Sequence, residues 1–150
     1  MASAVAVGAL LAVLGHGGTA GAHGAVPSGS SYSPASWASA LLSAGGWPQT
    51  ACNLAAIRAW EAAEGGNWEN SAAANPLDTT QPEPGSSTMN SAGVRAYTSW
   101  QAGFAATLTT LGYPAYAGIR SALSAGDNAQ AVADAVAGSP WGTVPFTATC

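Results

Sequence analysis

Residues 54–81 read LAAIRAWEAAEGGNWENSAAANPLDTTQ and hold the clearest structural signal in the 150-residue chain. Large apolar residues recur there every three positions, at Leu54, Ile57 and Trp60. This spacing predicts an amphipathic helix with one apolar face. Glu64 projects close to the centre of that face, and a pair of glycines at 65–66 ends the helix behind it. The pattern therefore directs a carboxyl group toward the core at the end of a helix.

A carboxyl group in this position has its pKa raised by two effects. Burial disfavours the ionised form, and the negative end of the helix dipole disfavours it again. We therefore expect Glu64 to remain protonated near neutral pH, as a general acid must. Glu61 competes with it, since it lies only somewhat farther from the centre of the same face. Glu64 is preferred because it ends the helix, where a side chain can meet a cleft; an exposed Glu64 at a frayed helix end is the alternative.

The composition restricts the chemistry that the folded body can carry out. The two histidines, His16 and His23, lie in the N-terminal segment, and the chain has no lysine. This argues against nucleophiles activated by histidine and against zinc sites built on it. The acid–base groups of the body are seven carboxylates: Glu61, Glu64, Glu69, Asp78, Glu83, Asp127 and Asp134. Carboxylates alone point to sugar cleavage, and the sequence implies no metal and no organic cofactor.

Charge argues against a nucleic-acid partner. The formal net charge is −4, and 7% of the residues are charged. The three cationic side chains, Arg58, Arg95 and Arg120, are too few and too scattered to neutralise a track of phosphates.

The N-terminal segment has the features of an export signal. Residues 1–14 are almost wholly apolar, and an Ala-Gly-Ala site follows at 20–22, although no basic residue precedes the apolar run. A helix needs roughly 20 apolar residues to span a bilayer, so we expect no stable membrane anchor. The prediction is a signal peptide over 1–22, a linker over 23–32 and one domain over 33–150, secreted as a monomer to the cell exterior or cell wall.

Two cysteines agree with export. Cys52 stands at the start of the glutamate helix, and Cys150 is the last residue. An even count in an extracellular chain predicts one disulfide, which would tie the C-terminal tail across the body. Two free buried thiols are the alternative.

The remaining patterns predict short helices and one hairpin. A first helix spans 34–44 behind the N-cap Ser33, and Thr50 caps the glutamate helix. Thr98 and Gln101 form a capping box for a third helix that ends at Gly112. Two shorter helices follow, one carrying Ile119 and Leu123 and the next opening at Asp127. Residues 77–81 and 94–97 are expected to pair as a small β-hairpin across a proline-rich loop. The fold class is therefore mainly α with a small β-hairpin.

The order of these segments resembles the lysozyme superfamily, in particular its goose-type lysozyme, soluble lytic transglycosylase and flagellar-type glucosaminidase branches. The resemblance runs from about residue 37 to 141. It rests on the glutamate helix with Glu-Gly-Gly-Asn at 64–67, Asn-Pro-Leu at 75–77 and Gly-Val-Arg-Ala-Tyr at 93–97. It implies that Glu64 is the general acid and that residues 78–81 line a sugar groove. Lytic transglycosylases usually show a Gly-Leu-Met-Gln-like segment where this chain has LDTTQ, which leaves the exact reaction open.

The sequence thus predicts a lysozyme-like hydrolase of peptidoglycan glycan strands: a muramidase, a lytic transglycosylase or a glucosaminidase. A second carboxylate, Asp78 or Glu69, is one possibility, and the substrate's own acetamido group is the other. The side chains expected to bind sugar are Thr79, Thr80, Gln81, Trp68 and Tyr97, with Trp68 also open to a role as a loop anchor. A secreted, non-catalytic cell-wall or carbohydrate-binding domain on the same fold is the alternative function.

Overall fold

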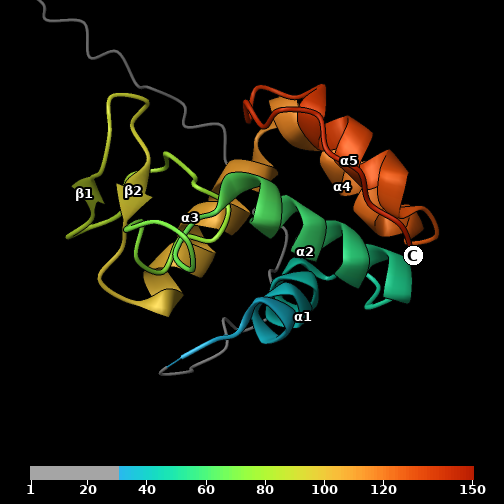
Figure 1. The fold of residues 1–150 in the computed structure, drawn as a ribbon, viewed down its shortest axis with the longest axis horizontal. Helices are drawn as coiled ribbons and strands as arrows, with labels where there is room; N and C mark the ends of the chain where they lie inside the picture. The colour runs from blue at the N-terminus through green and yellow to red at the C-terminus, as the bar shows by residue number, and fades with distance from the viewer. Residues whose placement is uncertain (1–30) are drawn as a thin grey trace, which may run out of the picture.

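The computed structural model describes residues 31–150, and the described part is mainly helical with one small hairpin (Figure 1). This confirms the predicted fold class. The signal peptide predicted over 1–22 and most of the predicted linker lie outside the described residues. The helices are α1 (Pro34–Gly45), α2 (Ala51–Glu64), α3 (Trp100–Gly112), α4 (Ala117–Ala125) and α5 (Ala129–Ala137), with a 3-10 turn, η1 (Pro114–Tyr116), before α4 and the strands β1 (Ser87–Thr88) and β2 (Arg95–Ala96).

Helix α2 occupies the middle of the domain and carries the segment that the sequence singles out. It packs against α1 on one side and α5 on the other, while α4 packs on α5 and α3 lies between these helices and the hairpin (Figure 1). The largest fully buried side chains come from all five helices and include Trp37, Leu41, Ile57, Trp60, Phe104, Ile119, Leu123 and Val132. Burial of each such side chain contributes roughly 1.5–3 kcal/mol, and Ile57 and Trp60 hold α2 in this core. Within residues 31–150, no helix has the length and apolar character of a membrane span.

The predicted starts of α1 and α2 are confirmed by their caps. The Ser33 hydroxyl accepts a hydrogen bond from the Ser36 amide at 3.3 Å, and the Thr50 hydroxyl accepts one from the Asn53 amide at 3.1 Å. Gly46 then ends α1 in the left-handed region at φ 72°.

Two predicted helix starts are wrong by one residue. The cap of α3 is Ser99 and not Thr98, because the Ser99 hydroxyl accepts from the Ala102 amide at 3.2 Å. The cap of α5 is Asn128 and not Asp127, because its Oδ1 accepts from the Ala131 amide at 3.1 Å. In each case two neighbouring residues have good capping side chains, so the sequence alone does not decide between them.

The predicted hairpin has the wrong first strand. The segment at 94–97 does supply a strand, but β2 pairs antiparallel with β1, with Ser87 opposite Ala96 and Thr88 opposite Arg95. Residues 77–81 form a loop instead, held to β2 by the bond from the Arg95 amide to the Thr79 carbonyl at 3.2 Å. The loop departs from strand geometry at Asp78, whose φ is 49°.

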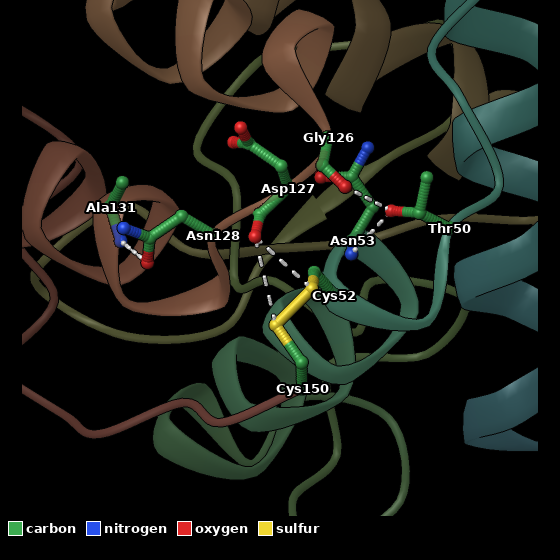
Figure 2. Close-up of a disulfide and its surroundings, with 8 residues drawn as sticks. All are labelled: Thr50, Cys52, Asn53, Gly126, Asp127, Asn128, Ala131 and Cys150. Atoms are coloured by element: carbon green, nitrogen blue, oxygen red, sulfur yellow. Dashed lines mark hydrogen bonds between the residues drawn. A yellow bond between two sulfur atoms is a disulfide. The ribbon is translucent and has the colours of Figure 1, made fainter.

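The predicted disulfide is present between Cys52 and Cys150, 98 positions apart in the sequence (Figure 2). Beside it, the Thr50 hydroxyl donates to the Gly126 carbonyl, and the Asp127 carbonyl oxygen lies 3.4 Å from the Cys52 sulfur. The bridge therefore joins the start of α2 to the C-terminal tail, next to the connection between α4 and α5.

We expect the double variant Cys52→Ser/Cys150→Ser to unfold more easily than the wild type. In the chain-entropy model, removing a cross-link that closes a loop of about 100 residues lowers the free energy of unfolding by roughly 4 to 5 kcal/mol. Urea unfolding monitored by circular dichroism measures the difference, and reductant should lower the midpoint of the wild type but not of the variant. Equal midpoints would show that the bridge does not stabilise the fold. Activity at low temperature should survive, because Cys52 is roughly 18 Å along the helix from Glu64.

Candidate functional site

Glu64 is the last residue of α2 and is half-buried. Its Oε1 accepts hydrogen bonds from the Trp60 indole at 3.2 Å and from the Thr143 hydroxyl. Trp60 lies one turn earlier on α2, whereas Thr143 comes from the C-terminal segment. Burial raises the pKa of Glu64, and these two hydrogen bonds oppose the rise. Glu64 therefore keeps its proton to a higher pH than an exposed glutamate does.

The two glycines after Glu64 let a loop close over the end of α2. Gly65 ends the helix in the left-handed region at φ 70°, with its amide on the Glu61 carbonyl. Gly66 has no room for a side chain: a Cβ atom there would lie 2.1 Å from the Asn75 carbonyl oxygen and 2.5 Å from Asp78 Oδ1. The Glu-Gly-Gly pattern thus places a second carboxyl group close to Glu64.

The loop that carries Asp78 is held by the buried side chain of Asn75. Its Nδ2 donates to the Thr79 carbonyl at 2.9 Å and to the Arg95 carbonyl at 2.7 Å, and its Oδ1 accepts from the Thr79 amide at 2.9 Å. These bonds connect the Asn-Pro-Leu segment to β2. They fix the position of the Asp78 backbone relative to the end of α2.

Asp78 interacts electrostatically with Glu64. Burial raises its pKa to about 6, a hydrogen bond from Asn70 Nδ2 to its Oδ2 at 3.1 Å opposes the rise, and the charge of Glu64 adds to it. Two neighbouring carboxyl groups with raised pKa values are a common feature of functional sites.

A cavity of about 260 Å³ opens beside Asp78, and we call it the Asp78 pocket. Its lining residues come from five parts of the chain and are Asp78, Thr79, Thr80, Ala92, Thr110, Tyr116, Pro140 and Trp141. The Trp141 ring meets Trp60 edge-on at 4.7 Å and Tyr116 at 5.4 Å, and its indole donates to the Leu77 carbonyl. Trp60 also donates to Glu64, so side-chain contacts run from Glu64 through the buried Trp60 ring to Trp141, although neither Glu64 nor Trp60 lines the pocket.

The predicted sugar-binding residues of the loop have unequal access to this pocket. Thr80 is exposed, whereas Thr79 is buried and shares a hydrogen bond with the Thr110 hydroxyl at 3.0 Å. Gln81 accepts from the Tyr113 hydroxyl through its side chain and from the Tyr97 hydroxyl through its carbonyl. Tyr97 is itself buried, and burial raises its pKa. Thr80 is therefore the loop side chain best placed to meet a ligand.

Trp68 and Glu69 do not join the Asp78 pocket. They line a second cavity of about 210 Å³, which we call the Glu61 cavity; its lining residues are Pro34, Arg58, Glu61, Ala62, Gly65, Gly66, Trp68 and Glu69. The Trp68 indole donates to the Tyr32 carbonyl at 3.3 Å, and its ring stacks on Trp100 at 6.0 Å. These contacts are those of a loop anchor. Of the two candidate second carboxylates, Asp78 is the one whose pKa is affected by the charge of Glu64.

Glu61 differs sharply from Glu64 in its surroundings. It is 4% exposed, and neither carboxyl oxygen has a hydrogen-bond partner among the described residues. Burial raises its pKa to about 8, and the charge of Arg58 opposes the rise. It lines the Glu61 cavity and not the Asp78 pocket.

Sequence reasoning missed three parts of this site. Thr143 lies 79 positions after Glu64, in a tail with no helical or strand periodicity, so no pattern connects the two residues. Tyr116 belongs to a 3-10 turn too short to produce a pattern. Trp141 is also missed, because only nearness to Glu64 along the chain separates the loop tryptophans in the sequence, and this favours Trp68.

Comparison with protein-family models, with curated proteins and with solved structures finds no match for this chain. Within residues 31–150, no group of three or more histidine, cysteine or acidic side chains is arranged to hold a metal ion.

Proposed function

We propose that this protein cleaves the glycan strands of peptidoglycan, with Glu64 as the general acid. The observation that carries the proposal is a half-buried carboxyl group with a raised pKa that interacts with a second carboxyl group, Asp78, which lines an open pocket together with Tyr116 and Trp141; Glu64 itself is not a lining residue of that pocket. A group that keeps its proton can protonate the bridging oxygen as the glycosidic bond breaks. Aromatic rings and hydroxyl groups such as those of Trp141, Tyr116 and Thr80 suit the apolar faces and hydroxyl groups of a sugar.

The hydrogen bonds of Glu64 indicate which oxygen carries the proton. Trp60 and Thr143 both donate to Oε1, so Oε1 serves as an acceptor. The proton of the neutral acid is therefore on Oε2, which would give it to the leaving oxygen. The carboxylate left after transfer keeps the same two donors, and these stabilise its charge.

The direct test is digestion of purified peptidoglycan followed by mass spectrometry of the soluble fragments. Cleavage should release muropeptides, and the new ends identify the reaction: reducing ends show that water entered, whereas anhydro ends show that it did not. Protein that sediments with the insoluble material but releases no fragments would replace the proposal with the non-catalytic binding domain.

We expect neither Asp78→Asn nor Glu69→Gln to lower the cleavage rate more than about tenfold. Glycosidases of this kind can use the acetamido group of the substrate in place of a second carboxylate, as the resemblance to lytic transglycosylases implies. Initial rates of fragment release measure both variants. A loss of a hundredfold or more in Asp78→Asn alone, with native circular dichroism, would instead give Asp78 the role of base or nucleophile.

We further propose that the protein acts outside the cytoplasm as a monomer. The Cys52–Cys150 disulfide supports this location, because such bonds persist in oxidising compartments. Peptidoglycan lies in the same compartments.

A further inference from the structure

The C-terminal tail brings a hydroxyl group to the carboxyl group of Glu64. Thr143 is 7% exposed, lies in a segment without regular secondary structure, and donates a hydrogen bond from its hydroxyl to Glu64 Oε1. The Trp60 indole donates to both of these oxygen atoms, at 3.2 Å to Glu64 Oε1 and 3.2 Å to Thr143 Oγ1. The three side chains thus form a closed ring of hydrogen bonds at the end of α2.

The chemistry of the three groups fixes the direction of each hydrogen bond in this ring. An indole N–H can only donate, so the Thr143 oxygen accepts from Trp60 and its own hydrogen is directed to Glu64. The terminal torsion of a glutamate side chain is soft, so an unrestrained carboxyl group can exchange its two oxygens by rotation. Two donors on the same oxygen favour one of these orientations over the other.

The same part of the tail also holds the loop that carries Asp78. The Trp141 indole donates at 2.8 Å to the carbonyl of Leu77, the residue before Asp78. Between Trp141 and Thr143 the chain turns at Gly142, whose φ of 92° is rarely adopted by other residues. Residues 141–143 therefore contact both the end of α2 and the loop with the second carboxyl group.

The position of Thr143 is restrained by the rest of the tail. The tail ends at the start of α2, where Cys150 is bonded to Cys52 (Figure 1). The seven residues from 144 to 150 reach at most roughly 24 Å, and the two ends of α2 that they connect are roughly 18 Å apart, which leaves little slack. Gln130 of α5 holds the tail as well, because its Oε1 accepts from the Ala148 amide at 3.0 Å. Thr143 is therefore held in place even when the disulfide is absent.

We propose that Thr143 is a positioning residue for the general acid: its hydroxyl, oriented by Trp60, holds Glu64 Oε1 as an acceptor and leaves the transferable proton on Oε2. This inference rests on the proposed function, because only a general acid must present its proton to a leaving oxygen. Thr143 acts through Glu64 and does not line the Asp78 pocket. The C-terminal tail is thereby a functional part of the site.

The hydrogen bond from Thr143 also affects how firmly Glu64 holds its proton. A donor stabilises an ionised carboxyl group more than a neutral one, and the bonds from Thr143 and Trp60 both lower the pKa that burial raises. Loss of the Thr143 hydroxyl should therefore raise the pKa of Glu64 further. Residues 138–150 carry no acidic or basic side chain, and the titratable group that interacts with Glu64 from the neighbouring loop is Asp78.

Three variants of the tail separate the hydroxyl from the packing of its side chain. Thr143→Val keeps the shape and removes the hydroxyl, and Trp60 still has Glu64 as its acceptor, so no buried donor is left unpaired. Thr143→Ser keeps the hydroxyl. Thr147→Val makes the same chemical change at an exposed position of the same tail. All three retain Asp78.

NMR of the full chain labelled with ¹³C at the glutamate carboxyl groups measures the pKa of Glu64 without any need for activity. The Glu64 signal is assigned by its absence in Glu64→Gln. In Thr143→Val we expect the pKa of Glu64 to lie roughly one pH unit above that of the wild type, as for an ionised group that loses one hydrogen bond. Thr143→Ser and Thr147→Val should keep the wild-type value. An unchanged pKa in Thr143→Val, or an equal rise in Thr143→Ser or Thr147→Val, overturns the proposal.

Initial rates of glycan cleavage provide the second readout. We expect kcat to fall roughly ten- to a hundredfold in Thr143→Val, with little change in KM, and to recover in Thr143→Ser, because a hydrogen bond to a charged group is lost in the first variant only. The alkaline limb of the pH profile should move to higher pH in Thr143→Val. Wild-type rates and pH profile in Thr143→Val would overturn only the role of Thr143, whereas absence of cleavage by the wild type would remove the general acid itself.

Discussion

Replacing Glu64 with glutamine should abolish measurable glycan cleavage while leaving the fold intact. Glutamine is nearly isosteric with glutamic acid, and its Oε1 can still accept the hydrogen bonds from Trp60 and Thr143. Its amide, however, does not release a proton to the glycosidic oxygen. General acid catalysis contributes about a hundred- to ten-thousandfold to a rate, so we expect a loss in that range. Loss of turbidity of a cell-wall suspension gives the rate, and circular dichroism checks the fold.

Two further glutamine variants serve as controls. Glu83→Gln makes the same chemical change at a carboxyl group that is not among the causes of the pKa shifts of Glu64 and Asp78, and it should keep the wild-type rate. Glu61→Gln should lose no more than about tenfold, because Glu61 does not line the Asp78 pocket. Comparable large losses in Glu61→Gln and Glu64→Gln, both with native spectra, would remove the reason for choosing Glu64 as the acid.

The parts of the fold that depend on local chemistry are predictable from the sequence. The helices are set by apolar spacing, caps and terminal glycines, all of which act within about four residues. The disulfide follows from a count of two cysteines in a chain with an apparent export signal. Errors of one residue at Ser99 and Asn128 arise where adjacent residues cap equally well.

The parts that depend on tertiary contacts are not predictable in this way. The strand that pairs with β2 differs from the predicted one for two reasons. The Asn75 side chain forms hydrogen bonds with the amide and the carbonyl of Thr79, and Asp78 adopts a left-handed backbone conformation. Thr143 contacts Glu64 because the C-terminal tail folds back beside the end of α2, and no local pattern predicts that course of the chain. The helical pattern puts both Glu61 and Glu64 near one face, and only packing shows that Glu61 is fully buried while Glu64 is half-buried.

The wild-type protein should lose stability as the pH rises from about 4.5 to about 8. Burial raises the pKa of Glu61 from the ordinary 4.5 to about 8. Between these values the folded protein holds a proton that the unfolded chain has released, so raising the pH favours unfolding. The contribution is fully present below pH 4.5 and is lost as the pH passes 8. At roughly 1.4 kcal/mol per pH unit, the difference is roughly 5 kcal/mol. Asp78 adds a smaller change of the same sign, because its pKa is raised to about 6.

Urea unfolding of wild type and Glu61→Gln at pH 4, 6 and 8.5 measures how much of the pH dependence of stability is due to Glu61. The two proteins should have similar stabilities at pH 4, where the wild-type carboxyl is neutral in both the folded and the unfolded state. At pH 8.5 the variant should be the more stable by several kcal/mol, because an amide requires no ionisation. Glu83→Gln should follow the wild-type curve. Parallel curves for wild type and Glu61→Gln would mean that Glu61 ionises as freely in the folded protein as in the unfolded chain, and that burial does not raise its pKa.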